Sequence, residues 1–342
     1  IAGFWRRSPI RPSYMKKTLT FVLLLWLIVC LQTASGQNLQ TAFEFTRLPS
    51  SAHGAALGGN VVSIPDADIA LFLSNPALLA GTTSSTIGLN AMTWFAQTKV
   101  AGASWSSPLD DRSRYAFNAM YVNYGKMEGR DASGIETGTF KSKDMEVGIT
   151  YAYKLTDNLD GGVTGNFICS RYSSKTSIAV GVNIGLLYSM QDKGVTIGLA
   201  ATNLGGQVKA FENTFQKIPF NLSTGVSWKP AHAPLRFTLT LDRLTDWEAD
   251  DFYFTDEEKR GFSEILKRHM SYGVDLFLTE RFYLAAGCNL CRRLEMSEKG
   301  SRGFTGITTG AGLHLDRFSF FVSYGKYQVS ESSLLLNIAF IL

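Results

Sequence analysis

The residue types that most often carry catalysis are present in this 342-residue chain, but their spacing forms no recognised catalytic set. Neither a Gly-x-Ser-x-Gly nucleophile turn nor a phosphate-binding loop occurs. The four histidines are scattered along the sequence, at His53, His232, His269 and His314. We therefore expect no enzymatic activity, no catalytic residues and no cofactor.

The cysteines give little support to metal or redox chemistry. Cys288 and Cys291 form a Cys-x-x-Cys pair, but no second pair or histidine cluster completes a zinc site. If both lie on a strand, residues three apart face opposite sides, so we expect no disulfide between them. Cys169 stands alone. We predict no metal site, and the redox state of the three thiols stays open.

The N-terminal stretch has the features of a targeting segment. Met15-Lys16-Lys17 precedes an apolar run, Phe21–Leu31, and small residues follow at 33–36. These features predict a secretory signal peptide that is cleaved near Gly36, with residues 1–14 upstream of the true start at Met15. A retained membrane anchor is the alternative. Lipidation of Cys30 is disfavoured because Val29 stands where a small residue is needed.

The overall charge of +4 depends on this leader. Five of the 33 basic residues and none of the 29 acidic residues precede residue 37, so the mature chain has 28 basic residues and a net charge of −1. A chain without basic excess has no electrostatic basis for binding nucleic acid. We expect no nucleic-acid partner.

Large apolar residues recur at every second position along most of the chain after residue 84. In Ile178–Tyr188 they alternate with mostly small or polar residues. A period of two predicts strands with two unlike faces. About fourteen such segments are expected, near residues 84–94, 97–106, 115–125, 144–155, 158–170, 177–190, 194–203, 220–229, 235–244, 270–278, 282–291, 303–313, 317–327 and 333–342.

The connections between these segments alternate in length. Short turns, such as 110–112 and 156–158, alternate with generally longer loops at about 126–143, 204–219, 245–269 and 292–302. Bacterial outer-membrane barrels show this alternation because their periplasmic turns are short and their extracellular loops long. We predict an all-β transmembrane antiparallel barrel of about 14 strands in the outer membrane. A secreted β-sandwich or propeller is the soluble alternative.

The stretch before the first strand has a different character, since two prolines interrupt it and small residues are common. Asn75 is expected to cap a short helix with Pro76 at its first position. Gly58 and Gly59 permit unusual backbone angles. Carboxylates such as Asp66 can accept hydrogen bonds from a barrel wall. We predict a plug in the lumen, with a plug motif that comprises Leu57, Gly58, Gly59, Asp66, Asp68, Asn75 and Pro76.

This stretch also carries a resemblance to a known family. Phe43-Glu44-Phe45, Leu57-Gly58-Gly59 and Asn75-Pro76-Ala77 resemble the start of the PorQ family, outer-membrane proteins of the type IX secretion system of Bacteroidetes. A shorter pattern within these residues, Ala56-Leu57-Gly58-Gly59 followed by Asn75-Pro76-Ala77, is similar to the wider FadL-like group, which includes the PorV relatives. His53 and Cys288 depart from the PorQ pattern, which has Arg and Tyr there. The departure at His53 leaves open any plug contact that depends on Arg.

The resemblance implies a non-enzymatic role at the cell surface. A PorQ-like barrel would anchor a PorZ-like surface protein, and through it PorU and PorV, so that secreted cargo is processed and attached to the surface. Outer-membrane lipid would surround it. The alternative is a FadL-like transporter of small hydrophobic compounds, for which the inward face, rich in small residues, offers little apolar lining.

The longest loop, residues 245–268, mixes acidic residues with aromatic ones. Exposed aromatic side chains on a charged loop indicate a protein contact, because aromatic residues are enriched at interface cores. We therefore predict partner-binding residues at Trp247, Phe252, Tyr253 and Phe254. The alternative is that these rings fold back over the barrel mouth.

Three regions are therefore expected. Residues 1–36 form the leader, residues 37–83 the N-terminal plug segment and residues 84–342 the barrel.

Overall fold

The computed structural model describes residues 41–66, 68–96, 98–130, 133–211, 215–254, 261–296, 304–327 and 331–342. The predicted signal peptide and residues 37–40 of the predicted plug lie outside the described residues.

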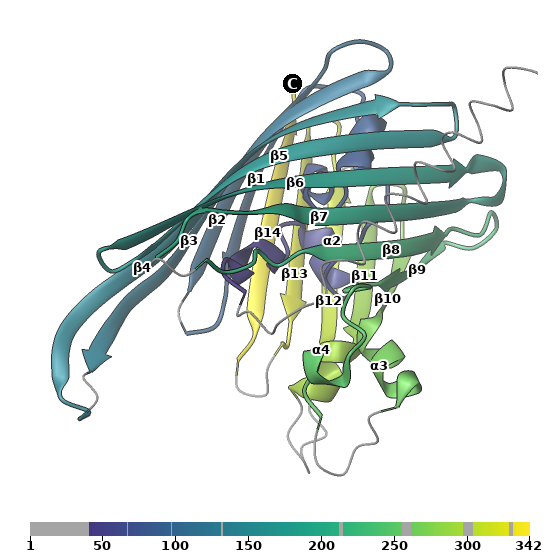
Figure 1. The fold of residues 1–342 in the computed structure, drawn as a ribbon. Coiled ribbons are helices and arrows are strands. Elements are labelled where there is room, and N and C mark those ends of the chain that lie inside the picture. The colour runs from purple at the N-terminus through teal and green to yellow at the C-terminus, as the bar shows by residue number, and fades with distance from the viewer. Residues whose placement is uncertain are drawn as a thin grey trace, which may run out of the picture. The chain divides into compact units, whose positions relative to one another are not determined.

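Within the described residues, fourteen strands form one closed antiparallel barrel, as the alternation predicted (Figure 1). Each strand pairs with its sequence neighbours, and β1 closes the barrel on β14. The strands are β1 Thr86–Thr93, β2 Lys99–Pro108, β3 Ser113–Arg130, β4 Glu136–Lys154, β5 Leu159–Tyr172, β6 Lys175–Met190, β7 Val195–Lys209, β8 Asn221–Trp228, β9 Leu235–Leu241, β10 Met270–Phe277, β11 Phe282–Asn289, β12 Ile307–His314, β13 Phe318–Gly325 and β14 Ser333–Ile341.

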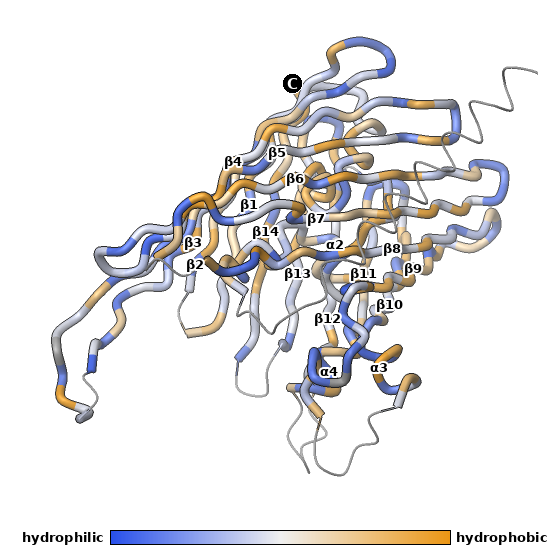
Figure 2. Tube along the Cα trace, viewed as in Figure 1, coloured by the Kyte–Doolittle hydropathy of each residue, from blue (hydrophilic) through white to orange (hydrophobic). Residues whose placement is uncertain are grey.

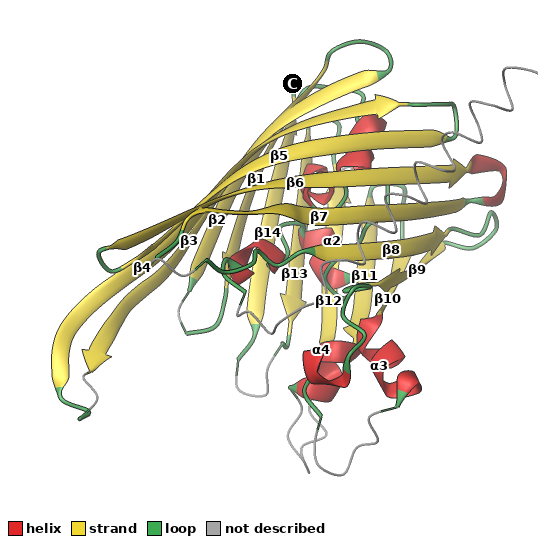
Figure 3. Cartoon of the chain, viewed as in Figure 1, coloured by secondary structure: helices red, strands yellow, loops and turns green. Residues whose placement is uncertain are grey.

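Short helices occur before the barrel and in its connections (Figure 3). Those before the barrel are the 3₁₀ helices η2 Glu44–Arg47, η3 Ile69–Leu73 and η4 Pro76–Gly81 and the α-helix α2 Ala52–Ala56. Those in the connections are η5 Gln191–Lys193, η6 Ala249–Asp251, α3 Phe262–His269 and α4 Leu290–Glu295. No helix among the described residues is long and apolar enough to cross a membrane.

The two faces of each strand differ as predicted. On β6, Val180, Val182 and Ile184 are exposed on the outside, whereas Gly181 and Asn183 face inward. Polar and apolar residues follow one another along the strands (Figure 2). An apolar exterior on a closed barrel suits a membrane-spanning protein, because every strand edge is paired and the lipid meets apolar side chains.

The two ends of the barrel have different connections. At one end, called the short-turn end, the strands are joined by short turns. The longer connections, such as residues 242–269, lie at the other end, called the long-loop end. One predicted loop, 126–143, is mostly strand, because β3 and β4 continue to Arg130 and from Glu136. A β-bulge between Asn123 and Lys126 shifts their register. The β3–β4 hairpin therefore projects past its neighbours (Figure 1).

The described residues 41–66 and 68–83 lie inside the barrel and are called the lumen segment. Helix α2 packs against β11–β14, η3 against β1 and β2, and η4 against β3–β6. Its buried apolar residues join inward-facing residues of the wall, including Val122, Ile168 and Leu335, in one core. The apolar core of this barrel is thus in its lumen.

Candidate functional site

The lumen segment is held by contacts that depend on small residues in the wall. A Cβ atom added at Gly273 of β10 would lie 2.7 Å from the Cβ of Leu57. One added at Gly310 of β12 would lie 2.6 Å from the Cβ of Ala56. Both distances are below any normal contact, so these glycines allow α2 to lie directly on the wall.

The predicted turn residues have the expected backbone geometry. Gly58 and Gly59 adopt positive φ angles of 106° and 127°, which favour glycine. The Asn75 side chain accepts a hydrogen bond from the Ala77 N–H at 3.1 Å, and Pro76 occupies the first turn of η4. Asn75 also donates to the Val62 carbonyl at 2.7 Å, so it joins two parts of the lumen segment.

Asp68 joins the lumen segment to β14. Its carboxylate accepts hydrogen bonds from the Ser51 hydroxyl at 2.6 Å and from the Asn337 amide at 3.4 Å. Ser51 in turn accepts from the Gly54 N–H and caps α2. Burial raises the pKa of Asp68.

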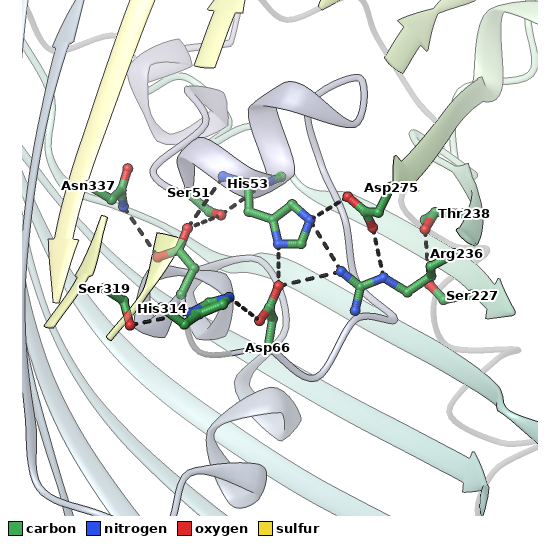
Figure 4. A network of polar contacts seen from close by, with 12 residues as sticks. Ser51, His53, Asp66, Ser227, Arg236, Thr238, Asp275, His314, Ser319 and Asn337 are labelled. Carbon is green, nitrogen blue, oxygen red and sulfur yellow. Dashed lines mark hydrogen bonds and ion pairs between the residues drawn. The ribbon is translucent and has the colours of Figure 1, made fainter. Parts of the chain in front are cut away.

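Asp66 belongs to a buried ion network that links the lumen segment to strands of the wall (Figure 4). His53 Nδ1 lies 2.5 Å from Asp66 Oδ2, and His53 Nε2 lies 2.9 Å from Asp275 Oδ1 on β10. Arg236 of β9 lies directly opposite Asp275, with Nε 2.7 Å from Asp275 Oδ2. The Arg236 Nη2 atom is 3.4 Å from Asp66 Oδ2. His314 of β12 approaches Asp66 at 3.6 Å.

The network balances its own charge when His53 is protonated. Two carboxylates face one guanidinium and one imidazolium, and the side chains of His53 and Asp275 are fully buried. Burial opposes the charged form of His53, but Asp275 and Asp66 outweigh it and raise the His53 pKa from 6.5 to about 9. Burial likewise opposes charge on Asp66, yet His53 and Arg236 hold its pKa well below the usual range. We call these four residues, His53, Asp66, Arg236 and Asp275, the lumen latch.

Sequence reasoning singled out Asp66 but missed its partners. Arg236 and Asp275 are each the sole charged residue of their strand, β9 and β10. An isolated charge at an inward position of an otherwise uncharged strand was the available signal. The sequence marks His53 only as one of four scattered histidines and as a departure from the PorQ pattern, and in the structure it supplies a positive charge at that position.

A second feature lies inside the barrel at the long-loop end, where a cavity of about 590 Å³ opens. Asp144, at its wall, accepts hydrogen bonds from the Tyr124 hydroxyl at 2.6 Å and from Ser170. The lining residues are Tyr124, Met127, Ser142, Asp144, Ser170, Tyr172, Lys175, Phe211 and Gln216. We call this space the mouth cavity. Three aromatic rings and a methionine make it suitable for an apolar ligand.

The predicted partner-binding residues fall into two groups. Phe252 and Phe254, each 7% exposed, form a small core with Ile265 of α3. Tyr253 is 65% exposed, and Trp247 stacks on Phe262 at 5.6 Å between ring centroids. Phe252 and Phe254 thus fold back, whereas Trp247 and Tyr253 reach the surface, where partner binding stays a prediction.

The described residues contain no group of three or more His, Cys, Asp or Glu side chains that could hold a metal ion. Cys169, Cys288 and Cys291 are free thiols. The strand assumed for the Cys-x-x-Cys pair ends at Asn289, so Cys291 lies on α4. Burial and Glu295 raise its pKa to about 12, which keeps the thiol protonated and unreactive.

No family model matches this chain, and no curated protein matches it. Solved structures do resemble it. The toluene transporter TodX of Pseudomonas putida is similar with a TM-score of 0.55 and 13% identity, over 85% of this chain and 97% of TodX. CymD, a monoaromatic hydrocarbon channel, has a TM-score of 0.52 and 12% identity, over 88% of this chain and 99% of CymD.

A FadL homologue of Pseudomonas aeruginosa is similar over 86% of this chain and 98% of its own length, at 11% identity and a TM-score of 0.48. At such low identity, the comparisons with TodX and CymD show the fold alone. The chain therefore has the fold of the outer-membrane barrels TodX and CymD, and the PorQ resemblance stays a prediction.

Proposed function

We propose that this protein admits small hydrophobic compounds through the outer membrane and that it is not an enzyme. The observation that carries the proposal is the mouth cavity, which is lined by Tyr124, Met127, Tyr172 and Phe211 at the long-loop end of the barrel. The inward face was expected to offer little apolar lining. These side chains supply it near the mouth. The proposed substrate class agrees with TodX, a toluene transporter, and with CymD, a monoaromatic hydrocarbon channel.

The proposal includes a location and an orientation. The chain is exported through a cleaved signal peptide and inserted in the outer membrane, with the long-loop end outside, as is usual for such barrels. The mouth cavity then faces the cell exterior, so compounds from outside reach this cavity before they reach the lumen segment. Beyond it the lumen segment lies in the path, so passage requires that this segment shift. The lumen segment, with its plug motif, acts as the gate.

Uptake of radiolabelled toluene by cells that express the barrel tests the proposal. Expressing cells should accumulate toluene faster than cells that carry the empty vector. Replacing two lining rings, by Tyr172→Ala and Phe211→Ala together, should slow uptake severalfold because the cavity loses its apolar wall. Tyr151→Ala with Tyr188→Ala, which removes two exposed rings from the barrel exterior, is the matched control. Uptake equal to that of the empty vector would contradict the proposal.

A second candidate is the anchor of a PorZ-like surface protein in a type IX secretion attachment complex. It is favoured by the exposed rings of Trp247 and Tyr253 on the loop that carries α3. Trp247→Ala with Tyr253→Ala should release such a partner during purification from detergent-solubilised membranes, while the barrel stays folded. Retention of the partner by this variant would exclude these rings as its binding site.

A further inference from the structure

The outer surface of the barrel carries basic side chains at one level near the long-loop end. Lys99, Lys143 and Arg171 project outward from β2, β4 and β5, and all three are exposed. Register places them side by side, because Lys99 pairs with Asn123, Asn123 with Lys143, and Lys143 with Arg171. Four neighbouring strands thus contribute to one row.

Two further lysines extend this row away from the membrane centre. Lys126 and Lys141 lie opposite each other on β3 and β4, just past the bulge, and both are exposed. The five residues Lys99, Lys126, Lys141, Lys143 and Arg171 are called the basic row. Glu128, the next exposed acid on β3, pairs instead with Arg130 at 3.3 Å. Among the described residues, no carboxylate forms an ion pair with the basic row.

The basic row begins where the apolar exterior ends. Tyr121, two residues before Asn123, and Met145, two residues after Lys143, are exposed on the same outward face. Phe117, Val147 and Phe167 continue this apolar surface toward the short-turn end. In a membrane, the row therefore lies at headgroup level and the apolar residues lie against acyl chains.

The surface at this level is also hollowed. A recess of about 580 Å³ is lined by Tyr121, Asn123, Lys141, Lys143, Arg171 and Ser173, among others. An arginine fork, two ammonium groups, an amide and a hydroxyl suit the oxygens of a phosphate group.

We infer that the basic row binds the phosphate groups of an anionic lipid of the surrounding leaflet. The headgroup phosphates occupy the recess, and the acyl chains of the same molecule lie along Tyr121 and Met145. Continuity of the recess with the apolar exterior favours a lipid over a free phosphate ion, because an ion would gain nothing from that surface. The inference uses the barrel exterior only, so it stands or fails independently of toluene uptake.

Native mass spectrometry of the full barrel in detergent tests this inference, with diphosphorylated lipid A as the probe. Lys141→Gln, Lys143→Gln and Arg171→Gln together should weaken lipid binding at least about tenfold, since each basic residue at an anionic surface contributes appreciably. The charge-retaining set Lys141→Arg, Lys143→Arg and Arg171→Lys should bind within about threefold of wild type. Lys193→Gln, Lys229→Gln and Arg317→Gln, all exposed at the short-turn end, form the matched control and should bind as wild type.

Two further binding measurements use the wild-type chain, so they do not depend on how the variants fold. Lipid A without its phosphates should bind at least about tenfold more weakly than the diphosphorylated form. Inorganic phosphate at millimolar concentration should leave lipid binding unchanged. Equal binding of both lipids, displacement by inorganic phosphate, or full binding by the glutamine variant would each overturn the inference.

Discussion

His53 connects the lumen segment with the wall through its charge. Its two ring nitrogens can donate to both carboxylates of the lumen latch only when the ring is protonated, because a neutral imidazole has one N–H. Arg236 supplies the second positive charge, with Asp275 directly opposite it on β10. A buried set of two cations and two anions is stabilising only while all its partners are in place.

The stability of the barrel should therefore depend on pH through His53. Its pKa rises from 6.5 in the unfolded chain to about 9 in the fold. The contribution of protonated His53 to the unfolding free energy is complete below pH 6.5 and is lost as the pH rises through about 9. It amounts to at most about 3 kcal/mol of unfolding free energy. Urea unfolding in lipid vesicles between pH 6 and 10 measures it, and His53→Gln should remove this dependence. A wild type with constant stability over that range would rule out the protonated histidine.

Asp275 should be the least replaceable member of the lumen latch. Asp275→Asn leaves Arg236 and the His53 ring facing one carboxylate, so we expect a loss of about 3 kcal/mol in unfolding free energy. Adding Arg236→Gln should recover part of the loss, because the uncompensated cation is then gone. Asp192→Asn, in the exposed turn η5, is the matched control. Additive losses from Asp275→Asn and Arg236→Gln would argue against direct coupling.

At the scale of elements, the lumen segment owes its position to the wall as much as to its own caps. Helix α2 has five residues and η4 has six, which is too short for either to be stable alone. Glycines at inward positions of β10 and β12 let α2 approach closely. The segment is therefore best regarded as part of the barrel core.

Filling one of these glycine positions should disturb the segment. Gly273→Val forces side-chain atoms against Leu57 and should cost about 1–3 kcal/mol of unfolding free energy. Gly165→Val on β5 is the matched control, because a Cβ there meets nothing within 4 Å. Equal unfolding free energies for the two variants would mean that Leu57, the residue after α2, does not press on β10.

The strands were predictable and most of the site was not, for a physical reason. Alternation is a local property, so residues such as Ile178–Tyr188 reveal a strand without its neighbours. Pairing between Asp275 and Arg236 depends on register across a connection of 28 residues, which alternation does not encode. The cap formed by Asn75 and Pro76 was predictable because it is local. The extension of β3 and β4 was missed because charged residues interrupt its alternation.

The whole molecule has three functional parts in series. The mouth cavity opens at the long-loop end, the lumen segment lies in the interior, and the lumen latch binds that segment to the wall. The chain shares its fold with TodX and CymD. Under the proposed function, the lumen segment must move for a compound to pass.

A reversible cross-link between the lumen segment and the wall tests whether this movement is needed. The Ser63 and Ser227 hydroxyls, in the lumen segment and on β8, lie 2.7 Å apart, so cysteines at both positions can form a disulfide. Ser85 and Ser107 lie 2.7 Å apart outside the lumen segment and form the matched control pair. Both pairs are made in a chain whose Cys169, Cys288 and Cys291 are replaced by alanine.

Toluene uptake is then measured into vesicles that contain each barrel, oxidised and then reduced. Oxidation of the Ser63→Cys and Ser227→Cys pair should abolish uptake, and reduction should restore it. The control pair should transport equally in both states. Equal uptake by the oxidised and reduced lumen pair would contradict the claim that the lumen segment is the gate.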